Sequence, residues 1–316
     1  MVGVERRPRA ARAAFDRWRR PLPVLAAFAL ILCLPPGRPA VAQSQDIIGK
    51  LGVLRTAYED TLLDIALDHD LGYVELVAAN PGIDPWIPGA DTKLLLPSAH
   101  LLPNAPRRGL VINLAELRLY YFPGDGAAPQ TFPIGIGRAG WETPVGVTKV
   151  VGRRKDPSST PPESIRKERP HLPAVIPPGP ANPLGRHALD LGWERYVIHG
   201  TNNPYGVGRR VSHGCIRLYP RDIEWLFSKV RPGTRVEVVD QPIKFGWSGG
   251  DLYMEAHPTQ RQVDVVEAGK AITADLGADL VIRIADAAGF EARRLNWPLI
   301  RQVVGERRGI PVRITE

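Results

Sequence analysis

The residues best suited to chemistry in this chain are one cysteine and two histidines, Cys215, His213 and His199. A cysteine attacks as its thiolate, but the ordinary pKa of the thiol is about 8.5, so a nearby histidine or backbone N–H groups must make the thiolate available. His213 precedes Cys215 by two residues, which places both side chains on one side of a strand. His199 reaches Cys215 if the loop 201–211 folds back as a hairpin. The residues alone leave both histidines open as the base.

The neighbours of the cysteine add binding groups. Gly214 allows close backbone approach, and the N–H groups around Gly214 and Cys215 are candidates to hold an oxyanion. Arg217 follows on the side of the cysteine and is a candidate to bind a substrate carboxylate.

Two other interpretations of these residues are open. His199, His213 and Cys215 have ligand chemistry for a zinc ion with one open position, although their spacing fits no standard zinc finger. Alternatively, Cys215 is a buried small residue and the histidines are polar core residues. The glycine-flanked, histidine-rich setting argues against this last interpretation.

The elements that must position these residues are mainly strands. Residues 196–198 form a strand that places His199 at its end, and an apolar face at helical spacing predicts a helix over 222–230. Prolines and glycines separate the segments, since the chain has 32 prolines and 31 glycines. Further strands are predicted at 110–114, 117–122, 131–137, 147–151, 188–191 and 235–239.

Residues 153–187 carry nine prolines and little apolar periodicity. A structureless stretch of this length inside a compact domain is typical of a functional lid or binding loop. Because strands resume at residue 188, we predict a lid over the site rather than a disordered linker.

The first 42 residues are typical of an export signal. Seven arginines precede the apolar run 24–34, which ends near the small residues 40–42. The run is too short for a membrane span of about 20 residues, so a retained N-terminal anchor is the weaker alternative. If cleavage follows Ala42, Cys33 is lost and Cys215 is the only thiol, which cannot form an internal disulfide. Paired arginines leave Sec and twin-arginine export both open.

The net charge of +8 lies mostly in this leader, because residues 1–42 hold eight arginines and two acids. The remaining chain is nearly neutral. It therefore has no electrostatic footprint for nucleic acid, and we expect no nucleic-acid partner.

Two further units flank the central strands. Residues 50–98 predict the order strand, helix, helix, strand, with Thr61 as a helix cap. Residues 241–316 mix short strands and helices in a small α/β extension that carries no chemical motif.

Two families resemble these segments. Residues 50–98 resemble a LysM module, a binder of cell-wall glycans, through Glu59-Asp60-Thr61-Leu62, Asn80-Pro81 and Leu94-x-Leu96-Pro97. Residues 108–240 are similar to the L,D-transpeptidase (YkuD-type) catalytic domain, and the combination resembles its periplasmic branch. The motifs that carry this second resemblance are His199-Gly200-Thr201, Ser212-His213-Gly214-Cys215-Ile216-Arg217, Thr143-Pro144-x-Gly146 and Gly179-Pro180-x-Asn182-Pro183.

The resemblance implies a fold class and a role for each residue. The fold is mainly β with α+β parts: a β-sandwich catalytic domain, a small βααβ LysM-like module and the α/β extension. Cys215 is the nucleophile, and His199 is the general base and acid, with the Gly200 carbonyl orienting it. The supporting residues are Ser212, His213 and Gly214, which shape the thiol loop and oxyanion site, and Arg217, which contacts substrate.

The resemblance also implies the reaction and its partners. Cys215 attacks the peptide bond after the L-centre of diaminopimelate in a peptidoglycan tetrapeptide stem, D-alanine leaves, and an amine resolves the thioester. No cofactor or metal is implied, and the location is the periplasm. The acceptor is left open between a second stem, giving 3→3 crosslinks, and an outer-membrane protein or lipoprotein. A non-catalytic peptidoglycan-binding adaptor and a zinc-dependent wall hydrolase are the alternatives.

Overall fold

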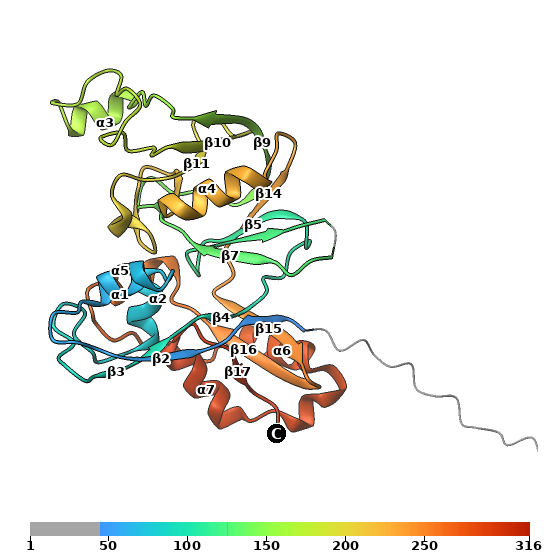
Figure 1. Cartoon of the computed structure of the whole chain (residues 1–316). Helices are drawn as coiled ribbons and strands as arrows, with labels where there is room; N and C mark the ends of the chain where they lie inside the picture. Colours follow the sequence, from blue (N-terminus) through green and yellow to red (C-terminus); the bar gives the residue numbers. More distant parts are fainter. Residues whose placement is uncertain (1–44, 125) are drawn as a thin grey trace, which may run out of the picture. The chain divides into compact units, whose positions relative to one another are not determined.

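The computed structural model describes residues 45–124 and 126–316 (Figure 1), so the predicted leader lies outside the described residues. Within the described ranges, no helix has the length and apolar character needed to cross a membrane.

The N-terminal module contains the predicted order strand, helix, helix, strand. Thr61 caps the first helix, because its side-chain oxygen accepts from the Asp64 N–H at 3.1 Å. The two inner strands pair in antiparallel fashion, and so do the two short strands that flank them in the sequence. The elements are β1 (Ile47–Gly49), β2 (Gly52–Arg55), α1 (Leu62–Asp68), α2 (Tyr73–Ala79), β3 (Lys93–Leu96) and β4 (Ala99–Leu101).

Eight strands of the central domain form one sheet in the order β13-β11-β10-β9-β14-β5-β6-β7. Its ten-residue strand β9 pairs with β14 through its first half and with β10 through its second half, so it joins both parts of the sheet (Figure 1). The prediction of a mainly β fold with added helices is confirmed. The prediction of a β-sandwich differs in detail, because these eight strands are hydrogen-bonded into one sheet. The strands are β5 (Gly109–Asn113), β6 (Arg118–Phe122), β7 (Gln130–Pro133), β9 (Gly146–Lys155), β10 (His187–Leu191), β11 (Val197–His199), β13 (Ile216–Arg217) and β14 (Arg235–Val239).

The segment predicted as one strand over 131–137 is two strands in different sheets. Pro133, which has no N–H to donate, ends β7, and the chain then turns to form β8 (Ile136–Gly137) beside β12 (Arg210–Ser212). The backbone is closely approached at Gly135, where an added Cβ would lie 2.3 Å from the Gly206 carbonyl oxygen. This turn carries the chain from the sheet to the loop that holds Cys215.

Helix α4 (Pro220–Lys229) follows β13 and packs on the sheet through Ile223 and Leu226, which are fully buried. Proline at its first position is compatible with helix, because that N–H has no partner inside the helix. A short 3₁₀ helix, η1 (Pro204–Gly206), lies in the loop between β11 and β12.

The proline-rich segment 153–187 has more regular structure than predicted. Its first residues extend β9, and α3 (Glu163–Glu168) forms within it. Ser159 and Ile176 pair as a β-bridge beside the buried Asn182, whose Nδ2 donates to the carbonyls of Pro157, Ile176 and Pro177. The side-chain amide of Asn182 thus holds the base of this loop. A search for apolar periodicity could not find this order, because it depends on a buried polar group.

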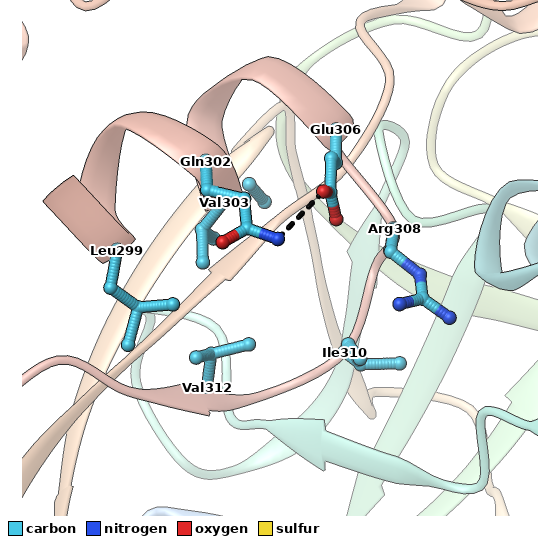
Figure 2. Close-up of a pocket in the computed structure, with 8 residues that line it drawn as sticks. Leu299, Gln302, Val303, Glu306, Arg308, Ile310 and Val312 are labelled. Atoms are coloured by element: carbon cyan, nitrogen blue, oxygen red, sulfur yellow. Dashed lines mark hydrogen bonds between the residues drawn. The ribbon is translucent and has the colours of Figure 1, made fainter. Parts of the chain in front are cut away.

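The C-terminal extension is a small α/β unit with its own core of buried residues such as Leu252, Met254 and Ile300. A cavity of about 120 Å³ lies between α7 and the segment leading to β17, and in Figure 2 the Gln302 amide points to the Glu306 carboxylate at 2.8 Å. The elements are β15 (Ile243–Ser248), β16 (Asp251–Ala256), α5 (Gln260–Glu267), α6 (Ala278–Ala288), η2 (Gly289–Arg294), α7 (Trp297–Glu306) and β17 (Val312–Arg313).

The module and the central sheet share one hydrophobic core, which includes Leu62 and Leu76 of the module with Leu110 and Leu119 of the sheet. A buried ion pair crosses the same junction: Glu75 accepts from Arg118 Nη2 at 2.7 and 2.9 Å. The described chain is therefore one compact unit.

Candidate active site

The site begins with two parallel strands. β11 and β13 pair so that Ile198 lies opposite Ile216 and His199 opposite Arg217. Both isoleucines are fully buried, so the alternation of side chains along a strand directs His199 and Arg217 to the other face. Cys215 immediately precedes β13. The loop after His199 returns as a parallel crossover that includes β12, rather than as the expected hairpin.

The thiol of Cys215 is partly buried, and its Sγ lies 3.5 Å from the Arg195 carbonyl oxygen. Burial raises the pKa of this thiol, against the backbone hydrogen bond at Val197 and the positive charges of Arg217 and Arg154, which lower it. The thiol is therefore protonated at rest near neutral pH.

His199 is only 3% exposed, and its Nδ1 lies 2.5 Å from the Gly200 carbonyl oxygen. A carbonyl only accepts, so Nδ1 carries the proton and Nε2 is left as the basic nitrogen. Burial, reinforced by the charge of Arg217, lowers the pKa of His199 to about 3. The imidazole is therefore neutral, in the form that a general base requires.

The side-chain hydrogen bonds of His199 and Cys215 in the described chain go to backbone groups, not to each other. Catalytic hydrogen bonds are often loose in a resting enzyme and tighten when substrate binds. The arrangement is a neutral imidazole at the end of β11 and a neutral thiol just before the paired strand β13.

Arg217 and Arg154 both act electrostatically on His199 and Cys215, and the effect of Arg217 is the larger. The backbone N–H and carbonyl of Arg217 pair with Gly135 at 2.9 Å each, which fixes the start of its side chain. Its Nε is buried without a hydrogen-bond partner among the described residues. Burial lowers the pKa of Arg217, and its charge lowers the pKa of both His199 and Cys215.

The thiol loop, defined as residues 212–215, is held by two hydroxyl groups. Ser212 Oγ donates to the Cys215 carbonyl at 2.6 Å and accepts from the Gly214 N–H at 3.1 Å. Thr143 Oγ1 donates to the Gly214 carbonyl at 2.8 Å and accepts from the Gly137 N–H at 3.1 Å. Since the Gly214 N–H is already engaged, the Cys215 N–H is the better candidate for an oxyanion.

Gly214 is required by conformation as well as by space. Its φ is +102°, and an added Cβ would lie 2.8 Å from Cε1 of Tyr196. The backbone conformation just before Cys215 would therefore be strained by any residue larger than glycine at position 214.

His213 faces a different set of groups from His199. Its Nε2 lies 3.1 Å from Glu168 Oε2 of the lid and 3.1 Å from Arg138 Nη2, and its ring packs edge-on against Trp141. The structure thus separates the two histidines that spacing alone left equivalent. Glu168 and Arg138 were not predicted as site residues, because no local pattern joins them to the cysteine. Thr143 was quoted only as part of the Thr143-Pro144-x-Gly146 motif, and its role in holding the thiol loop was not predicted.

A cavity of about 430 Å³ lies between segment 179–187 and Gly200, the residue that follows His199. Its wall combines residues of the lid, of the loop after β11 and of the first turn of α4. The lining residues are Asp156, Gly179, Pro180, Asn182, Gly185, Arg186, His187, Gly200, Thr201, Asn202, Pro220 and Glu224.

Metal-ligating side chains gather away from this site. In the described residues the group close enough to share an ion is His100, Glu116 and Glu255, and it does not include the residues of the zinc hypothesis. Lys244 Nζ lies 2.7 Å from Glu116 and 2.9 Å from Glu255, so an ammonium group already pairs with both carboxylates.

Comparison with known proteins gives a consistent result. Residues 107–238 match the family model of YkuD, the L,D-transpeptidase catalytic domain. The chain is 36% identical over 305 residues to the probable L,D-transpeptidase ErfK/SrfK of Escherichia coli, covering 92% of this chain and 96% of that protein. It is 45% identical over 210 residues to the probable L,D-transpeptidase YcfS of Escherichia coli, covering 63% of this chain and 66% of that one. A crystal structure of an Enterococcus faecium L,D-transpeptidase mutant aligns with a TM-score of 0.34 at 22% identity, covering 48% and 52% of the two chains.

Proposed function

Because the chain belongs to the L,D-transpeptidase family, we propose that it is an exported enzyme that remodels tetrapeptide stems of peptidoglycan through a thioester on Cys215. The observation that carries the mechanism is the pairing of β11 with β13. It places a neutral imidazole beside the arginine that also acts on the thiol.

In the first half-reaction, His199 Nε2 takes the proton of Cys215 as Sγ attacks the carbonyl of diaminopimelate that is bonded to D-alanine. The tetrahedral intermediate collapses, the C–N bond breaks, and His199 returns the proton to the departing amine of D-alanine. In the second half-reaction an acceptor amine attacks the thioester. His199 accepts its proton and returns it to the sulfur.

The resting thiol is not activated, because burial raises its pKa. We infer that the proton moves only once substrate is bound, and that Arg217 and Arg154 stabilise the thiolate as it forms. Slow alkylation of the free enzyme near neutral pH is therefore compatible with catalysis. Turnover and acyl-enzyme formation are the informative measurements.

The module supplies a plausible contact with wall glycans. Tyr58 and Trp86 are 81% and 58% exposed on the loops that follow β2 and α2. Exposed aromatic rings present flat apolar faces on which sugar rings can stack. This supports glycan binding by residues 50–98, and with the predicted leader it supports a periplasmic location.

The acceptor divides the proposal into two branches. A second stem as acceptor gives 3→3 crosslinks, whereas a lysine or other amine of an outer-membrane protein or lipoprotein gives protein attachment. Wall digests from cells with and without the gene separate crosslinked dimers from bound protein.

The deciding experiment incubates the purified protein with tetrapeptide muropeptides and measures free D-alanine together with the intact mass. We expect D-alanine release and an adduct on Cys215, both lost in Cys215→Ala. Full turnover by that variant would overturn the proposal. Wall binding without turnover in the wild type would favour the adaptor, and loss of turnover with a chelator would favour the zinc hydrolase.

A further inference from the structure

Three segments bring a carboxylate and two of its partners together at the thiol loop. Arg138, after β8, donates from Nη2 to both oxygens of Glu168 at 2.8 Å each. His213 Nε2 lies 3.1 Å from Oε2 of the same carboxylate. Glu168 is the last residue of α3, which belongs to the proline-rich segment 153–187. Its carboxylate occupies the cradle, defined here as the side chains of Arg138 and His213.

Contacts that do not involve the lid hold the Arg138 backbone and the His213 ring. The Arg138 N–H donates to the Ser212 carbonyl at 3.0 Å, and its own carbonyl accepts from the Trp141 N–H at 2.9 Å. Gly137 is paired with Ser212 between β8 and β12, and the Trp141 ring packs on His213. The Arg138 backbone and the His213 ring are therefore held beside the thiol loop by contacts that do not involve Glu168, and the Arg138 guanidinium also contacts His213 Nε2 at 3.1 Å.

The lid makes this contact through few groups. Among the described residues, the hydrogen bonds that join the side chains of α3 to other parts of the protein are those of Glu168 with Arg138 and His213. The other ion pair of this helix, between Glu163 and Lys167, is internal to it. Asn182 holds the base of the lid, so α3 can leave the cradle while the base stays attached.

The ion pair between Glu168 and Arg138 is weak enough for another carboxylate to replace Glu168. The Glu168 and Arg138 side chains are 39% and 42% exposed, and ion pairs with this much solvent contact contribute little to stability. The guanidinium of Arg138 nevertheless suits two-point recognition of any carboxylate. The site therefore suits any ligand that, like Glu168, offers a carboxylate.

We propose that Arg138 and His213 form a subsite for a free carboxylate of the donor stem, which Glu168 occupies while the lid is closed. This inference rests on the proposed function, since a tetrapeptide donor offers the carboxylate of its terminal D-alanine and that of the diaminopimelate side chain. Donor binding displaces Glu168 and opens the lid. Glu168 is thus a competitor of the substrate within the chain.

The test measures donor binding by calorimetry in the Cys215→Ala background and KM in the active enzyme. Three variants are compared: Glu168→Gln, Arg138→Gln, and Glu163→Gln as the matched control on the same helix. The donors are the tetrapeptide, its C-terminal carboxamide, and an analogue with lysine in place of diaminopimelate.

We expect Glu168→Gln to tighten tetrapeptide binding severalfold and to lower KM in the same direction, and Arg138→Gln to weaken binding by about tenfold, the size of one charge-assisted hydrogen bond. Glu163→Gln should change neither. The effect of Arg138→Gln should vanish for whichever analogue lacks the bound carboxylate: the carboxamide if D-alanine is held, the lysine analogue if diaminopimelate is held.

Two results would overturn the inference. One is weaker binding in Glu168→Gln, which would make the contact a structural clamp. The other is an equal effect of Arg138→Gln on all three donors. Failure of the proposed function is a separate result, the absence of D-alanine release by the wild type, because binding in the Cys215→Ala background is measured without turnover.

Discussion

His199 lies directly opposite Arg217 on the parallel strands β11 and β13, on the face away from the buried isoleucines. The arginine charge acts against protonation of the imidazole and in favour of the thiolate. One fixed cation therefore favours a neutral base before reaction and an anionic nucleophile during it.

The first prediction separates the two histidines. Replacing His199 by alanine removes the base, so kcat for D-alanine release should fall by about 10²–10⁴-fold, the usual contribution of general-base catalysis. His213→Ala should keep most of kcat, because the His213 ring contacts Glu168, Arg138 and Trp141 instead. Steady-state kinetics at saturating donor measures both. Equal losses of kcat in the two variants would contradict the assignment.

The second prediction concerns stability against pH. The pKa of His199 is about 3 in the folded protein against 6.5 in the unfolded chain, so the unfolded state binds more protons between these values. The His199 contribution to the free energy of unfolding should therefore fall as pH drops below about 6.5. Between pH of about 7.5 and 5 the loss should be about 2 kcal/mol.

Urea unfolding of the wild type and His199→Gln at both pH values measures this contribution as the difference between their pH dependences. Asp222 acts in the opposite direction, because burial raises its pKa to about 6 and its stabilising effect is lost as pH rises. It is present in both proteins and cancels in the comparison. Identical pH dependence in the two proteins would refute the prediction.

Local pattern was sufficient for most of the strands and for the residues nearest the cysteine. The apolar residues before His199 located the strand that ends there, and Thr61 located the start of α1. The two-residue strand at Ile216 was not predicted, and the stretch expected to hold His213 and Cys215 on one side of a strand is a loop. Spacing could not choose between His199 and His213, because the choice depends on strand pairing. Parallel pairing of β11 with β13 is a long-range relation that periodicity does not encode.

The partners missed from the sequence are those joined only by tertiary structure. Arg138 and Glu168, the two missed partners of His213, come from separate segments, and each looks like an ordinary polar residue in isolation. The lid was assigned too little regular structure, because a buried amide at Asn182, rather than an apolar stripe, organises its base.

The third prediction tests the shape of the thiol loop. Gly214→Ala combines a φ of +102° with a Cβ 2.8 Å from Tyr196, so it should destabilise the protein by about 1–3 kcal/mol and reduce activity. Gly233→Ala is the matched control, because φ there is +92° with no atom within 4 Å of the added Cβ. It should carry the backbone strain without the clash. Thermal unfolding and D-alanine release should show the larger loss at Gly214, and a larger loss at Gly233 would argue against the clash.

The fourth prediction concerns the junction between the module and the sheet. Glu75 and Arg118 form an ion pair with side chains only 5% and 3% exposed, and Glu75 also accepts from the Gly72 N–H at 2.9 Å. Glu75→Gln leaves the Arg118 charge buried without its counter-ion, which should lower the free energy of unfolding by about 3–5 kcal/mol. Asp91→Asn breaks the exposed pair with Arg55, whose side chains are 78% and 63% exposed, and should cost about 1 kcal/mol or less.

Chemical denaturation followed by tryptophan fluorescence measures both variants. Because the module and the sheet share one core, the wild type should unfold in a single transition that Glu75→Gln shifts as a whole. Loss of the module alone, with the catalytic domain still folded and active on soluble donors, would show that the two parts are thermodynamically independent. Equal shifts in Glu75→Gln and Asp91→Asn would show that burial of the ion pair contributes nothing to the junction.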